Sequence, residues 1–110
     1  MNHDLDLKAQ VKKILKVVQE LAPGRLVELR IPPYAAIQCV EGGNHRRGNP
    51  PNVVEMAPEA LIALSNNSHK WDELLAENLI HASGTHSNLE ELFVRVSIIM
   101  KSAGRRDFGK

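Results

Sequence analysis

The residues with the clearest chemical potential lie between two apolar, strand-like runs, in the segment EGGNHRRGNPPN. This segment holds His45, Arg46 and Arg47 between glycines and a pair of prolines. An arginine can grip a carboxylate or phosphate through two parallel hydrogen bonds, and glycines let backbone amides approach the same anion. Loops of this length are uncommon in compact domains unless they are functional or disordered. The segment predicts an anion-facing loop, with a solvated surface loop whose arginines pair with Glu41 or Glu55 as the alternative.

Metal and nucleophilic chemistry have weaker support. The histidines available in the body of the chain are His45, His69, His81 and His86. No pair has the i, i+4 spacing of two ligands on one helix, and no acidic residue completes a known metal motif. Ser83 to His86 places a serine near a histidine, but a turn entering a helix explains this order equally well. We expect no metal, no cofactor and no catalytic residue, since nucleophile-elbow, catalytic-cysteine and phosphate-loop patterns are also absent from the sequence.

Charge and composition narrow the classes of partner. The formal net charge is +1, with 43% hydrophobic and 25% charged residues, which is ordinary for a globular protein. Nucleic-acid binding usually needs a strongly basic domain or aromatic residues that stack on bases. The net charge is close to zero, and no aromatic residue is adjacent to His45 in the sequence. We therefore expect no nucleic-acid partner.

The single cysteine and the N-terminus predict a location. Cys39 has no second cysteine to pair with, and its neighbours Ile37 and Val40 indicate a buried structural thiol in a reducing compartment. The N-terminal residues lack the basic and apolar parts of a signal peptide, and no run has the length of a membrane span. The sequence predicts a cytoplasmic protein without stable membrane insertion.

The residue pattern of the N-terminal part of the chain predicts an amphipathic helix, which begins near Asp4 or Asp6 and ends before Pro23. Its apolar residues recur at spacings of three and four, at Leu7, Val11, Ile14, Val18 and Leu21. The lysines Lys8, Lys12, Lys13 and Lys16 fall on the other side, either as a solvated face or as a surface for an acidic partner.

The period then changes to two, which is typical of strands. Strands are predicted over residues 25–31, 34–40, 53–56 and 80–84. Three further helices are predicted. The first covers residues 58–65, and the second follows a Ser68 cap and contains Trp71 to Leu79. The third follows a capping box formed by Ser87 and Glu90 and ends near Gly104.

Three consecutive strands joined by short links pair most easily in antiparallel order, which excludes a doubly wound parallel sheet. The predicted fold class is α+β, with a mostly antiparallel sheet of four to five strands and helices packed on one face. The chain is predicted to form one domain over residues 1–104, followed by a tail over 105–110.

A family resemblance enters at three consecutive motifs. These are PPYAA from Pro32, the core His45 to Gly48, and PPNVVE ending at Glu55. Together they resemble the signature of the bacterial sterol carrier protein family, related to type-2 sterol carrier proteins. A fainter similarity continues through Trp71 and the strand end at Ala82 to Gly84.

The resemblance implies a fold with an apolar tunnel between sheet and helices, and a basic loop that faces a ligand. The resemblance favours His45, Arg47 and Asn52 in particular as ligand-binding residues. Arg46, at a position where the family varies, and Tyr34 complete the predicted set. The cavity-lining residues are then Trp71, Leu75, Phe93, Val96 and Met100. At helical spacing such residues equally describe an ordinary core.

The function that these observations favour is a small non-enzymatic binding module for a hydrophobic or amphipathic, lipid-like molecule. The alternative is an accessory domain that binds a protein partner. A related domain resembles the C-terminal part of mycothiol-dependent maleylpyruvate isomerase-type proteins, where it is joined to a metal-binding helical bundle. This chain has no room for such a bundle, so any catalysis would need another chain.

Overall fold

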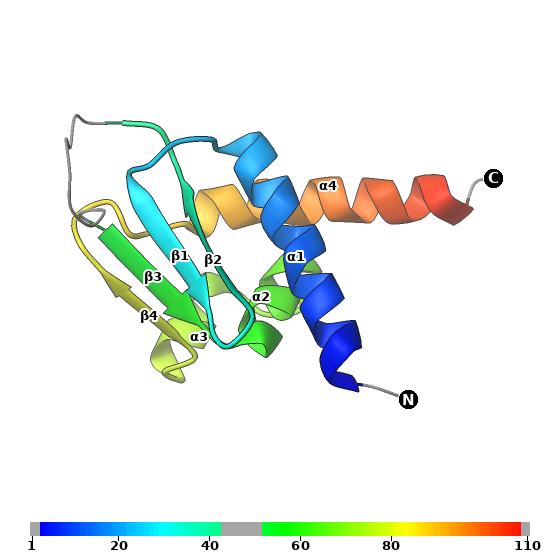
Figure 1. The fold of residues 1–110 in the computed structure, drawn as a ribbon, viewed down its shortest axis with the longest axis horizontal. Coiled ribbons are helices and arrows are strands. Elements are labelled where there is room, and N and C mark those ends of the chain that lie inside the picture. Colours follow the sequence, from blue (N-terminus) through cyan, green and yellow to red (C-terminus); the bar gives the residue numbers. More distant parts are fainter. Residues whose placement is uncertain (1–2, 43–51, 109–110) are drawn as a thin grey trace.

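The computed structural model describes residues 3–42 and 52–108 of the chain. The helices are α1 His3–Leu21, α2 Pro58–Ser65, α3 Trp71–Ala76 and α4 Glu90–Phe108, and the strands are β1 Val27–Ile31, β2 Ala35–Cys39, β3 Asn52–Met56 and β4 Ile80–Ser83. Figure 1 shows the sheet on one side of the molecule and α1, α2 and α4 together on the other. The α+β class predicted from the sequence is confirmed.

The sheet is mixed, with the strand order β2-β1-β3-β4. β1 pairs antiparallel with β2, and β3 pairs antiparallel with β4. β1 and β3 are parallel, and Val27 is opposite both Cys39 and Asn52. Consecutive strands pair antiparallel as expected for β1 with β2 and for β3 with β4, but β2 and β3 are not neighbours, because β3 pairs with β1 instead. β2 ends and β3 begins beside Val27, at the same end of the sheet but on opposite edges of β1, and β3 is therefore parallel to β1.

Strand alternation positions the core. Along β1, Val27, Leu29 and Ile31 are buried, whereas Glu28 and Arg30 on the other face are partly exposed. On that face Glu28 accepts a hydrogen bond from the Arg30 guanidinium, with 2.8 Å between Oε2 and Nε. An alternating strand of this kind buries one face and leaves the other in solvent.

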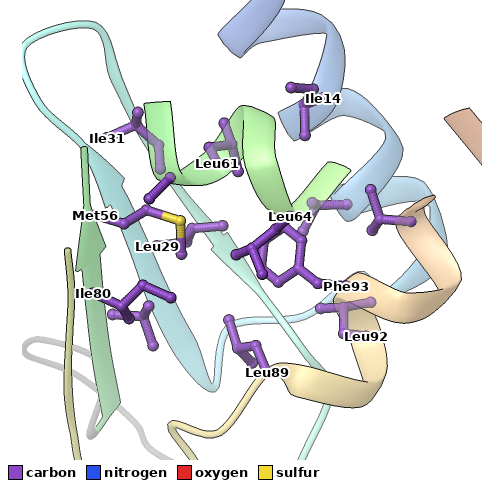
Figure 2. Packing of buried hydrophobic residues seen from close by; sticks show 14 of the residues in the cluster. Ile14, Leu29, Ile31, Met56, Leu61, Leu64, Ile80, Leu89, Leu92 and Phe93 are labelled. Atoms are coloured by element: carbon purple, nitrogen blue, oxygen red, sulfur yellow. The ribbon is translucent and has the colours of Figure 1, made fainter. Parts of the chain in front are cut away.

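The core lies between the buried sheet face and the helices. In Figure 2, Phe93 of α4 and Leu64 of α2 lie opposite Leu29 and Met56 of the sheet. Each of these four side chains is at most 5% exposed. Packing of this density makes the sheet–helix interface the main hydrophobic contribution to stability.

The helix ends differ from the predicted caps. The Ser87 hydroxyl donates to the Gly84 carbonyl (2.9 Å) instead of capping α4, and the Asn88 side-chain oxygen accepts from the Glu90 amide (2.9 Å). The predicted capping box is therefore wrong, because Ser87 turns back to the end of β4. The predicted end near Gly104 is also wrong, since α4 continues to Phe108.

The cap of α3 differs as well. The helix begins at Trp71, after Lys70, rather than under a Ser68 cap. The Lys70 amide donates to the Glu73 carboxylate at 2.8 Å, so an acidic side chain in the first turn satisfies this backbone donor. α3 ends at Ala76, and Asn78 follows in the left-handed region with φ 62°.

Candidate ligand-binding groove

The segment predicted to face an anion is attached to one end of the sheet. The described chain leaves this end after Gly42, beyond β2, and resumes at Asn52, the first residue of β3. His45, Arg46 and Arg47 lie outside the described residues. Their two flanking positions nevertheless fix the end of the molecule to which they belong.

The groove beside this segment, here called the loop-side groove, has a volume of about 630 Å³. Another groove, of about 670 Å³, lies between α1, α2 and α4. The walls of the loop-side groove come from the end of β2, the α1–β1 connection, the β4–α4 connection and the first turns of α4. Glu41 and Gly42, the last described residues before the basic segment, line it. The described chain on the N-terminal side of the predicted basic loop therefore belongs to the rim of this groove.

Part of the groove lining belongs to a backbone connection between α1, β1 and β2. Val40 donates to the Ala22 carbonyl (2.7 Å), and the Leu26 amide donates to the Val40 carbonyl (2.9 Å). Gly24 lies against this connection with φ 148°, and a Cβ on Gly24 would be 2.1 Å from the Val40 carbonyl oxygen. Only glycine fits there without a shift of the backbone.

Asn52 joins two walls of the groove. The side chain is 1% exposed, its Nδ2 donates to the Leu26 carbonyl (3.1 Å), and its Oδ1 accepts from the His86 amide (2.8 Å). Leu26 and His86 both line the groove. The predicted ligand-binding residue is thus engaged with backbone groups, and it holds the β1 wall against the β4–α4 wall.

The lining of the groove is amphipathic. Its apolar part includes Leu26, Val40, Leu89 and Leu92. Its polar part includes Arg95 and His86, with Glu41 and Glu91 as the acidic members. A lining of this kind can hold a molecule with an apolar body and a polar or charged end. Sequence reasoning did not find these α4 residues, because their approach to β2 depends on the tertiary packing.

Tyr34 lies away from this groove. It follows the Pro32-Pro33 pair in the turn between β1 and β2, whereas Asn52 is opposite Val27 at the other end of β1. The Tyr34 hydroxyl donates to the Asp4 carboxylate of α1, and this hydrogen bond raises the pKa of Tyr34. The structure therefore does not bring Tyr34 together with Asn52.

The predicted cavity-lining residues fall into separate places. Trp71 and Phe93 are both 2% exposed and stack with their ring centroids 6.4 Å apart and an angle of 22° between the planes. Val96 is fully buried, and Leu75 is partly buried against the core. Met100 lines the other groove, between helices. The first four of these residues belong to the core or pack against it, and Trp71 and Phe93 also line a small pocket of about 180 Å³.

Cys39 is a buried thiol, as its apolar neighbours predicted. The side chain is fully buried and unpaired, and burial raises the pKa of Cys39 to about 11. Desolvation disfavours the thiolate, so the thiol is neutral at physiological pH. Over residues 3–42 and 52–108, no three His, Cys, Asp or Glu side chains are grouped so as to hold a metal ion.

Comparison with known proteins identifies the family. The model of the family described as bacterial SCP ortholog matches residues 4–94. The chain therefore belongs to this family, as the motifs between Pro32 and Glu55 predicted.

Solved structures add one more comparison. Sterol Carrier Protein 2 from Yarrowia lipolytica (apo form) is similar at 11% sequence identity and a TM-score of 0.38, over 87% of this chain and 85% of that chain. No curated protein matches the chain. In the described part of the chain, no helix has both the length and the apolar character needed to cross a membrane.

Proposed function

We propose that this chain is a non-catalytic binding module for a hydrophobic or amphipathic, lipid-like molecule, and that the groove beside residues 42 and 52 holds it. The observation that carries the proposal is the groove itself, whose volume of about 630 Å³ falls within the usual size of small-molecule sites. Membership of the bacterial SCP ortholog family supports the same class of ligand.

The apolar body of the ligand would lie against Leu26, Leu89 and Leu92. These leucines come from two walls that Asn52 holds together, so the site is built on rigid backbone contacts rather than on one loop. A preformed apolar surface lowers the entropic cost of binding. The accessory-domain alternative gains no support from the family match.

The anionic end of the ligand would face the basic segment. His45, Arg46 and Arg47 are the cationic candidates, because the segment begins at the groove rim beyond Gly42. An arginine that pairs with a carboxylate or phosphate forms a charge-assisted contact. The unpaired cysteine further supports a reducing, cytoplasmic setting for this carrier.

Filling the groove tests the proposal. Leu26→Trp should occupy apolar space and weaken binding of a nitrobenzoxadiazole-labelled fatty acid by about tenfold or more, measured by fluorescence titration. Ile99→Trp is the matched control, because Ile99 is 43% exposed and lines none of the grooves described here. Arg47→Ala should weaken the same binding while the melting temperature stays nearly unchanged.

The controls also define failure. Equal affinity of wild type, Leu26→Trp and Ile99→Trp would contradict the location of the site. No binding by any variant across a panel of fatty acids, sterols and neutral lipids would contradict the function. A large loss of stability in Arg47→Ala would show that Arg47 has a structural role instead.

A further inference from the structure

A second groove lies among the helices, on surfaces that do not line the loop-side groove. It has a volume of about 670 Å³ and is formed by α1, α2 and α4. Its residues include Lys13 of α1, Ile62 of α2 and Lys101 of α4. None of these residues contributes to the loop-side groove, so the two grooves can be tested separately.

The charge of this groove has one sign. Among the described residues that line it, Lys13 and Lys101 are the charged ones, and no acidic side chain is present. Along α1, Asp6 and Glu20 are equally far from Lys13, and the Asp6 carboxylate accepts a hydrogen bond from Gln10 at 3.2 Å. Among the described side chains, which are those of residues 4–42 and 52–103, neither lysine has an ion-pair partner. Two unpaired ammonium groups at one groove create a local attraction for an anion.

The remainder of the groove is largely apolar or neutral. Ile14 is buried at its base, Ile62 and Met100 are partly buried, and Ile98 is 58% exposed. A large aliphatic side chain exposed beside such a groove gains free energy when a ligand covers it. Methionine adapts its shape to an apolar ligand because its side chain is unbranched and flexible.

The groove depends on the C-terminal half of α4. The family match ends at residue 94, whereas Ile98, Met100 and Lys101 all follow it. The features that define this groove therefore lie partly outside the region that the chain shares with the family.

We propose that the groove between α1, α2 and α4 is a second site, which binds a small amphipathic anion. A carboxylate or phosphate lies between Lys13 and Lys101, and the apolar body covers Ile98 and Met100. The flexible lysine stems allow both ammonium groups to reach one compact anion. This site does not depend on the loop-side groove, and its ligand differs from a neutral lipid in needing a charged head.

The test is a titration of isotope-labelled protein with decanoate, decyl phosphate and decanol, each below its micelle-forming concentration, followed by NMR amide shifts. We expect the two anions to shift the amides of Asn67 and Ser97, which line the groove, and decanol to shift them far less. The stronger of the two anions identifies the head group as carboxylate or phosphate. Added salt should weaken the binding of both anions, because exposed lysines are screened.

Two double variants localise the effect. Lys13→Gln with Lys101→Gln should weaken anion binding by about tenfold or more, as expected from the loss of charge-assisted contacts. Lys12→Gln with Lys16→Gln removes the same charge from exposed positions of α1 that do not line the groove, and it should leave the affinity unchanged. The thermal unfolding midpoints of the two double variants should be similar to each other.

Any one of several results would overturn the second site. Among them are equal affinity in the two double variants, equal binding of decanol and the anions, and binding only above the micelle-forming concentration. Shifts confined to Thr85 and His86 would place the anion in the loop-side groove and reject the second site alone. The proposed function has a separate test in Leu26→Trp, so either site can fail while the other stands.

Discussion

Asn52 shows how one buried amide can organise a site. It is 1% exposed, and its two polar atoms bond to backbone groups of Leu26 and His86, which lie 26 and 34 residues away in the chain. The motif PPNVVE predicted an important residue here but not its partners. Those partners follow from the parallel register in which Asn52 is opposite Val27, and no local pattern contains that register.

Replacing this amide should cost stability even without a ligand. Asn52→Ala leaves the Leu26 carbonyl and the His86 amide without their partner, so the free energy of unfolding should fall by about 1–3 kcal/mol in urea titrations. Asn66→Ala is the control, because the exposed Asn66 side chain accepts one hydrogen bond, at its Oδ1 atom, from the backbone N–H of Ser68. Unchanged stability of Asn52→Ala with lost ligand binding would instead assign Asn52 directly to the ligand.

Cys39 gives a prediction for pH. Burial raises the pKa of Cys39 to about 11, from the ordinary thiol value of 9.0. Below pH 9 the thiol is neutral in both the folded and the unfolded chain, but between pH 9 and 11 only the unfolded chain ionises. Stability should therefore fall as the pH rises through this window, by up to about 2 kcal/mol.

The measurement compares wild type with Cys39→Ala by urea unfolding from pH 8 to pH 10.5. The variant should start less stable but lose less stability as the pH rises. A thiol reagent should also react slowly with folded wild type at pH 8 and rapidly in denaturant. Rapid reaction of the folded chain would contradict the burial of Cys39.

At the scale of elements, the α1–β1 connection decides the shape of the loop-side groove. The change of period from helical to alternating around Arg25 predicted that a turn occurs there. The contact of Gly24 with the Val40 carbonyl could not be predicted, because Gly24 precedes β1 whereas Val40 follows β2, and only the pairing of these strands brings the two residues together. The failed capping box at Ser87 has the same origin, since its hydroxyl bonds to Gly84 at the end of β4.

Substituting Gly24 should disturb this connection. In Gly24→Ala the new Cβ would collide with backbone 2.1 Å away, and φ 148° is unfavourable for alanine, so the variant should lose more than about 1 kcal/mol of stability. Gly42→Ala is a matched control with φ 147°, where, among the described residues, the Cβ would meet the Leu26 Cδ2 atom alone, at 3.3 Å. Calorimetric melting should show a larger loss for Gly24→Ala, and equal losses would contradict the role of the backbone contact.

For the whole molecule, sequence periodicity was sufficient for the α+β class and the order of elements, because apolar faces determine which elements pack. Periodicity did not locate the larger grooves. Trp71, Phe93 and Val96 are buried in the core, where Trp71 and Phe93 also line a pocket of about 180 Å³, and the two larger grooves lie at the sheet end and between the helices. Whether apolar residues at helical spacing form a core or line a cavity depends on how closely the neighbouring elements pack against one another. No local sequence pattern contains that packing distance.

The central claim is that this module carries a lipid-like molecule in the loop-side groove. The most direct measurement is native mass spectrometry of protein purified without detergent, compared with the denatured sample and with Leu26→Trp. We predict an adduct of one hydrophobic or amphipathic molecule that is released on denaturation and reduced in Leu26→Trp. An empty wild-type protein that also takes up no lipid from an added panel would contradict the claim.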